Sequence, residues 1–197
     1  MTPEDPRMRL SRRSFPSRSP RLALAGAALA LLAGCSILPE PQADPVRYFT
    51  LTEPVAAAPA GGVQVRPVQL AGHLRNRALA VRVGANEVVY LEHARWAEPL
   101  DEAVTQVLRA RLGAVAGEAT VTVQVQRCEL VRAEANAVQV AATYEIRRPG
   151  GGPVRSGAFT SSARTWDGRN PADLVALLRA ALGELADAMA RGVEPGS

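Results

Sequence analysis

The 197-residue sequence contains only two histidines and two cysteines, which limits the chemistry open to it. His73 and His93 have no second histidine three or four residues away, so the spacing typical of a zinc site is missing. No G-x-S-x-G or S-x-x-K motif occurs, since Ser161–Arg164 lacks the lysine. A triad of His93, Asp101 and a serine stays open as an alternative, but we expect no catalytic residue, no metal and no cofactor.

The apolar run from Leu22 to Gly34 is shorter than the ~20 residues that a membrane-spanning helix needs. It follows six arginines and ends in small residues, which is typical of an export signal. Its end, Leu32-Ala33-Gly34-Cys35, matches the lipobox of bacterial lipoproteins, in which the cysteine becomes the acylated first residue. We therefore predict lipidation of Cys35; an ordinary secretory signal with a chance cysteine, or an uncleaved anchor, is the alternative.

Two details of this segment stay open. Ser11–Phe15 (SRRSF) resembles the first half of a twin-arginine signal, but Pro16 departs from the usual apolar residue, so either export route fits. Met8 offers a second start for the chain.

The basic excess of the sequence belongs to the predicted signal peptide, residues 1–34. This segment holds six of the 23 basic and two of the 19 acidic residues, so 17 of each remain. The mature chain has no basic footprint, and we expect no nucleic-acid partner. Cys128 is then the only thiol besides Cys35, and its place in an alternating run predicts a small buried apolar residue.

We predict that residues 35–46, which include the lipidated cysteine, form a proline-rich tether, and that residues 47–197 form one domain that the export signal would place in the periplasm. The tether could hold this domain up to ~30 Å from the membrane. Alternation of apolar and polar residues predicts several strands. They are Tyr48–Leu51, Val63–Leu70, Ala78–Val83, Glu87–Leu91, Thr120–Val131, Asn136–Arg147 and Val154–Ala163. Pro67 indicates an edge or a bulge, because it cannot donate to a ladder.

Two segments show helical periodicity with an apolar stripe, Leu100–Val115 and a final helix that begins after Asn170 and ends at Gly192. Asn170 followed by Pro171 is typical of a helix start. Because each helix is apolar on one side, the two must cover a sheet. We predict a two-layer α+β domain, a mostly antiparallel sheet with one face covered by two amphipathic helices and the other face partly wet.

Arg95 and Trp96 precede the first helix and admit two interpretations. A bulky tryptophan here is commonly an anchor that pins the loop to the sheet. Alternatively, Trp and Arg are frequent hot spots of protein interfaces, so the pair could contact a partner.

Several segments resemble the ABC-type transport auxiliary lipoprotein family, of the paraquat-inducible protein C type. They are the lipobox, Arg47–Leu51, Val81-Arg82 followed by Ala85-Asn86, and above all Arg95–Leu100 (R-W-A-E-P-L). The similarity extends over essentially the whole mature chain, and the R-W-A-E-P-L block is its most specific part.

The resemblance implies an outer-membrane lipoprotein that faces the periplasm, and Ser36 after the lipidated Cys35 fits that membrane. It also implies an accessory component that docks, as a ring of copies, onto an MCE (mammalian cell entry) domain protein of an ABC system for lipid or other hydrophobic compounds. A second reading is a carrier that itself holds an acyl chain between sheet and helices. The first predicts a filled core, and the second an apolar cavity of several hundred Å³.

Overall fold

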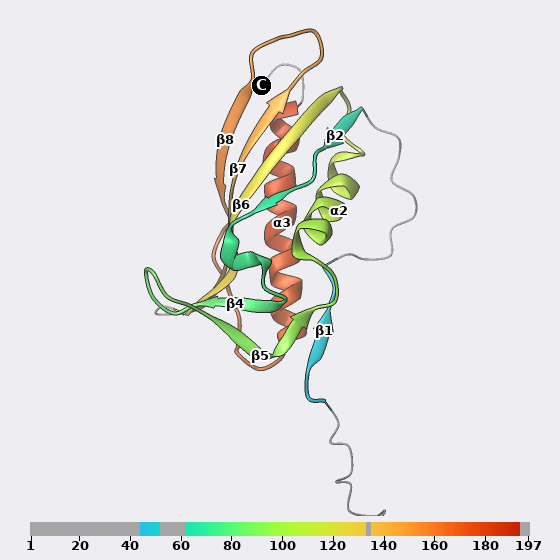
Figure 1. Ribbon diagram of the computed structural model, residues 1–197. Coiled ribbons are helices and arrows are strands. Elements are labelled where there is room, and N and C mark those ends of the chain that lie inside the picture. Colours follow the sequence, from blue (N-terminus) through green and yellow to red (C-terminus); the bar gives the residue numbers. More distant parts are fainter. Residues whose placement is uncertain (1–43, 52–61, 133–134, 194–197) are drawn as a thin grey trace, which may run out of the picture. The chain divides into compact units, whose positions relative to one another are not determined.

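The computed structural model describes residues 44–51, 62–132 and 135–193, and its contacts separate residues 1–44 from the domain that begins at Pro45. The domain has nine strands and two long helices within these described ranges (Figure 1). The elements are β1 (Arg47–Phe49), β2 (Val63–Val65), β3 (Gln69–Leu70), the 3₁₀ helix η2 (Gly72–Arg75), β4 (Ala78–Arg82), β5 (Val88–Trp96), α2 (Leu100–Leu112), β6 (Ala119–Arg132), β7 (Asn136–Arg147), β8 (Arg155–Thr160), β9 (Arg164–Thr165) and α3 (Pro171–Val193). Neither helix is long and apolar enough to cross a membrane.

The strands form one mixed sheet in the order β1-β5-β4-β6-β7-β8. The pairs β4–β5, β6–β7 and β7–β8 are antiparallel, and β9 adds to β7 in the same sense. Four short pairings are parallel: β1 with β5, and β2, β3 and β4 with β6. The predicted α+β class with two helices is confirmed, and its long ladders are antiparallel as expected.

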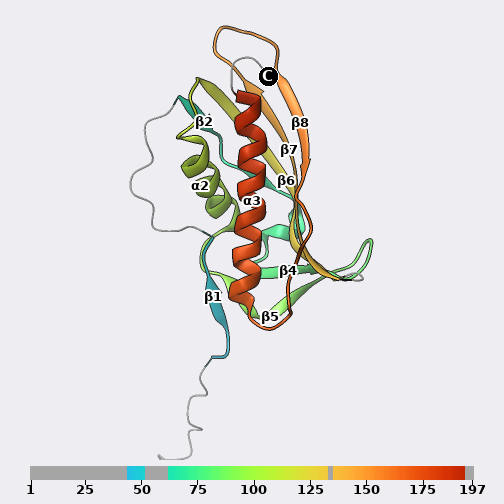
Figure 2. The ribbon, with the colours of Figure 1, turned by 180° about the vertical axis from the view of Figure 1, so that it is seen from behind.

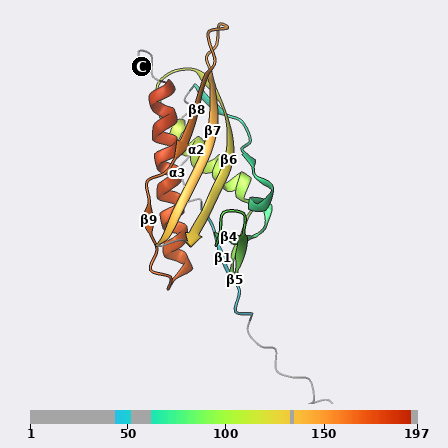
Figure 3. The same cartoon turned by 90° about the vertical axis from the view of Figure 1, so that its left-hand side faces the viewer.

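Both helices cover the same face of the sheet, with α3 running along β6, β7 and β8 and α2 beside it (Figures 2 and 3). The start of α3 follows the prediction, because the Ala172 N–H donates to Asn170 Oδ1 at 3.3 Å. The buried side of α3 is a continuous apolar stripe: Leu174, Val175, Leu178, Ala181, Leu182, Leu185, Ala186, Met189 and Val193. Burial of this stripe against the sheet makes the main core.

A bulge in β6 reverses its alternation halfway along the strand. Val125 pairs with Ala142 and Arg127 with Ala141, so Gln126 is the extra residue. Val121, Val123 and Val125 are buried before the bulge, and Cys128 and Leu130 after it. The same shift turns Glu129 toward the face that the helices leave uncovered.

Two strand predictions need correction. The predicted strand Val63–Leu70 is interrupted at Pro67, and the Val68 N–H next to the break donates to Thr105 Oγ1 of α2 at 3.0 Å. The strand predicted to end at Leu91 continues to Trp96 as β5, because β1 pairs with its second half. The short elements η2 and β9 were not predicted, since four and two residues show no periodicity.

Candidate functional site

The predicted lipobox, Leu32 to Cys35, lies outside the described residues, so lipidation stays a prediction. The described domain begins close behind the predicted tether, and β1 starts at Arg47. The start of β1 lies beside the start of α3, because Arg47 Nη1 donates to Asn170 Oδ1 at 3.1 Å. The chain that leads from Cys35 would therefore join the domain at this end.

Trp96 is the last residue of β5, and only 2% of its surface is exposed. Its backbone N–H donates to the Arg77 carbonyl at 2.7 Å, and it stands opposite Phe49 of β1. Arg95, by contrast, is exposed and stands opposite Tyr48. The structure thus places Trp96 in the core of the domain and Arg95 on its surface, so the two residues have different surroundings.

The two histidines also lie in different surroundings. His93 is exposed on β5 beside Glu92, with Nε2 3.9 Å from the carboxylate. His73 of η2 instead contacts the fully buried carboxylate of Glu129, with Nε2 3.0 Å from Oε2. Within the described parts of the chain, no group of three or more His, Cys, Asp or Glu side chains is placed to hold a metal ion.

Glu129 is the centre of a polar cluster at one end of the uncovered sheet face. Arg82 of β4 donates from Nε to Oε1 at 2.5 Å and from Nη2 to Oε2 at 3.4 Å. The Tyr90 hydroxyl donates to the His73 carbonyl at 3.0 Å and holds η2 from the β5 side. A buried carboxylate is tolerated when it is paired and hydrogen-bonded, and this one joins η2, β4 and β6.

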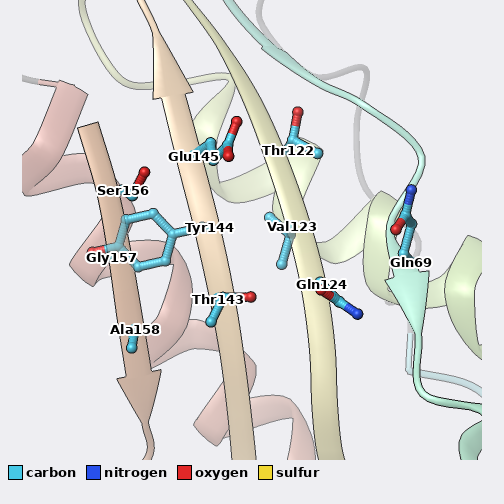
Figure 4. Close-up of a pocket in the computed structure, with 10 residues that line it drawn as sticks. All are labelled: Gln69, Thr122, Val123, Gln124, Thr143, Tyr144, Glu145, Ser156, Gly157 and Ala158. Atoms are coloured by element: carbon cyan, nitrogen blue, oxygen red, sulfur yellow. The ribbon is translucent and has the colours of Figure 1, made fainter. Parts of the chain in front are cut away.

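The uncovered face of β6, β7 and β8 carries neutral polar side chains around a shallow concavity of about 450 Å³ (Figure 4). Two rows cross the three strands in register: Thr122, Glu145, Ser156 and then Gln124, Thr143, Ala158. We call these six residues the open face. Its one carboxylate, Glu145, pairs with Arg147 at 3.2 Å, so the surface has little net charge.

Tyr144 shapes the border of the concavity by lying across Gly157 of β8 (Figure 4). A Cβ atom at Gly157 would come within 2.4 Å of Tyr144 Cζ, so a larger residue there would force the tyrosine ring to move. Periodicity in the sequence could place the strands, but it carried no signal for this cross-strand pair.

The interface between the helices and the sheet is filled by side chains. Leu182, Leu185 and Met189 of α3 and Val121 and Val123 of β6 are fully buried there. The described residues also line two concavities outside this interface. One lies at β2 beside Arg109, and the other lies at the start of α2.

Two titratable groups are shifted by their surroundings. Burial, together with the neighbouring charge of Glu129, raises the pKa of the Cys128 thiol to about 12. Hydrogen bonds from the Ser162 hydroxyl and N–H, with a contribution from Arg164, lower the pKa of Glu184 on α3. The raised pKa keeps the Cys128 thiol protonated at neutral pH. Glu184 links α3 to Ser162 and Arg164 after β8, and we call this contact the clasp.

Comparison with known proteins identifies one family and the fold. The family model described as ABC-type transport auxiliary lipoprotein component matches residues 49–190. A crystal structure described as an uncharacterized protein is 16% identical, with a TM-score of 0.62, over 75% of this chain and 97% of that chain. A Xanthomonas campestris protein of the DUF330 family is 22% identical, with a TM-score of 0.58, over 73% of this chain and 92% of that chain. No curated protein matches. The family match covers nearly all of the described domain.

Proposed function

Because the chain belongs to the ABC-type transport auxiliary lipoprotein family, we propose that it docks onto an MCE-domain protein of an ABC system that moves lipid or another hydrophobic compound. The family match over residues 49–190 is the observation that carries this proposal. The matched region is the folded domain itself, so the domain is the part that acts in transport. The ATPase, permease and MCE subunits are separate chains in this proposal.

The packing of the domain supports docking over carriage of an acyl chain. A carrier needs an apolar cavity of several hundred Å³. Here the α3 side chains that face the sheet, Leu182, Leu185 and Met189, are fully buried. We assign the partner contact to the open face, because neither helix covers it. Since the face has little net charge, its burial by a partner should cost little free energy of desolvation.

The proposal also includes place and assembly. Lipidation of Cys35, followed by Ser36, would hold the protein in the outer membrane with the domain in the periplasm. Several copies would form a ring around the end of the partner. Mass photometry of the purified full protein tests this part: the account predicts a closed oligomer, and a monomer at all concentrations would contradict it.

A capture experiment from membranes of the native host tests the docking itself. The lipidated wild-type protein serves as bait beside Thr143→Arg on the open face and Ala176→Arg on the exposed side of α3. A cation at the centre of a docking surface should lower recovery of an MCE-domain protein about tenfold or more. The Ala176→Arg control should recover it at the wild-type level.

Two results would contradict the proposal. Failure of the wild-type bait to recover any MCE-domain protein, with lipid bound to the purified protein, would favour the carrier. Equal recovery by both arginine variants would remove the open face from the contact while leaving the partner in place.

A further inference from the structure

The most exposed large apolar side chain of the described domain lies at the β1 end of the sheet. Four large apolar side chains are exposed among the described residues. Tyr48 lies on β1, whereas Val89 and Tyr90 lie at the end of β5 that pairs with β4, away from β1. The fourth, Val154, lies just before β8. Tyr48 is 58% exposed, the largest fraction of the four.

The backbone of β1 divides its side chains between core and surface. Phe49 packs against the core, and Leu51 after it is fully buried. Tyr48, which precedes Phe49 in β1, points the other way and stands opposite the exposed Arg95. We call Arg47, Tyr48 and Arg95 the β1 edge. Because β1 is the last strand on this side of the sheet, nothing in the described domain lies beyond it in the sheet order.

The β1 edge lies close in the sequence to Cys35, the predicted site of lipidation. Residues 36–46 separate it from Cys35, and as an extended proline-rich chain they reach up to ~30 Å. Helix α3, with 23 residues, is itself ~35 Å long. Its first turn meets Arg47 at this edge, and its last turn meets Arg148 and Arg155 at the opposite end.

We propose that the β1 edge rests in the headgroup layer of the membrane that holds Cys35. This rests on the proposed lipid anchor. The anchor keeps the edge at a high effective concentration next to lipid, which a protein partner in solution does not share. Tyrosine favours the boundary between water and hydrocarbon, and arginine reaches phosphate groups from the same depth.

Glu92 offsets part of the positive charge of Arg47 and Arg95, so we assign the main attraction for the membrane to Tyr48. The Arg47 guanidinium lies 5.1 Å from the centre of the Phe49 ring and donates to Asn170, which leaves further N–H groups for phosphate. Glu92 lies beside His93 on β5 and opposes part of the positive charge. We therefore expect binding to both zwitterionic and anionic lipid, with a modest gain in the anionic case.

The test uses the full lipidated protein in vesicles of phosphatidylethanolamine, with or without phosphatidylglycerol. A solvent-sensitive dye is attached at Glu92→Cys beside the edge or, as control, at Val154→Cys at the far end of the sheet. Cys128 is buried and leaves the new thiol as the reactive one. Quenching by spin-labelled lipid should be about twofold or more stronger at position 92 than at position 154.

A second substitution assigns the effect to Tyr48. In the Glu92→Cys background, Tyr48→Ser should abolish most of the difference, while Thr160→Ser on the exposed side of β8 should leave it unchanged. Equal quenching at both positions, or quenching that survives Tyr48→Ser, would overturn the proposal. Capture of the MCE-domain partner is a separate measurement. A negative quenching result would therefore contradict membrane contact of the β1 edge without contradicting docking through the open face.

Discussion

The two halves of the sheet are held in different ways. In the half formed by β6, β7 and β8, neighbours in sequence are neighbours in space, and antiparallel ladders run along most of β7. In the half formed by β1, β5 and β4, only the antiparallel β4–β5 pair joins neighbours in sequence. The parallel pairs β1–β5 and β4–β6 are short and join strands far apart in the sequence. The first half is stabilised by its ladder and by α3. The second depends on a few buried side chains, so single substitutions should affect it more.

The largest effect is expected at Trp96, which joins β1 and β5 to the core. Trp96→Ala should lower the free energy of unfolding by about 3–5 kcal/mol, because truncation of a buried aromatic leaves a cavity. Urea denaturation measures the change, with Arg95→Ala as the exposed neighbour that should change stability little. A Trp96→Ala protein that keeps its stability but loses capture of the partner would instead make Trp96 a contact residue.

A somewhat smaller loss of stability is expected at Glu129, where the two halves of the sheet meet. Glu129→Ala removes the carboxylate that pairs with Arg82 of β4 and contacts His73 of η2. Since breaking a buried pair leaves a charge uncompensated, the free energy of unfolding should fall by about 3 kcal/mol. Glu145→Gln, in an exposed pair on β7, is the control and should cost less than about 1 kcal/mol. Equal losses in the two variants would contradict the role given to the cluster.

A smaller, pH-dependent effect on stability is expected at Glu184 of α3, the helix that packs on β6, β7 and β8. Its pKa is lowered in the folded protein, so the clasp with Ser162 and Arg164 contributes stability above the unfolded carboxyl pKa. This contribution is lost as the pH falls through the folded pKa. Thermal melts of wild type and Glu184→Gln should therefore differ at pH 7 and converge in strong acid. A difference that grows toward acid pH would have the wrong sign.

The smallest effect concerns a group that should do nothing in the folded state. Burial raises the pKa of the Cys128 thiol to about 12, so few thiolates are present at pH 8. A thiol reagent added to a chain whose Cys35 is acylated or replaced should react with Cys128 only as fast as the domain opens. Reaction at the rate of a free cysteine would show that this part of β6 is accessible.

The same comparison explains how far the sequence could predict the structure. Local alternation located β6 and β7, and helical periodicity with Asn170 located α3. Four features depended on residues far apart in the chain: the parallel pairings, the extension of β5 to Trp96, the bulge at Gln126 and the burial of Glu129. Arg82 and His73 lie 47 and 56 residues from Glu129, so no local pattern could reveal that cluster. The sequence motif for lipidation lies outside the described residues and stays a prediction.

The candidate site divides in the same way. Arg95 and Trp96 stood out in the sequence, but only the strand register shows that one is exposed and the other buried. The open face gave no signal, because threonine, glutamine and serine at alternate positions are ordinary for a wet sheet surface. It became a candidate through the placement of both helices on the other face.

The most direct test of the central claim is site-specific photo-crosslinking in cells of the native host. A photoreactive residue replaces Gln124 on the open face or, as control, Ala176 on the outer side of α3. The account predicts a crosslink to an MCE-domain protein from position 124 and none from position 176. Crosslinking at equal yield from both positions, or at neither, would contradict docking through the open face.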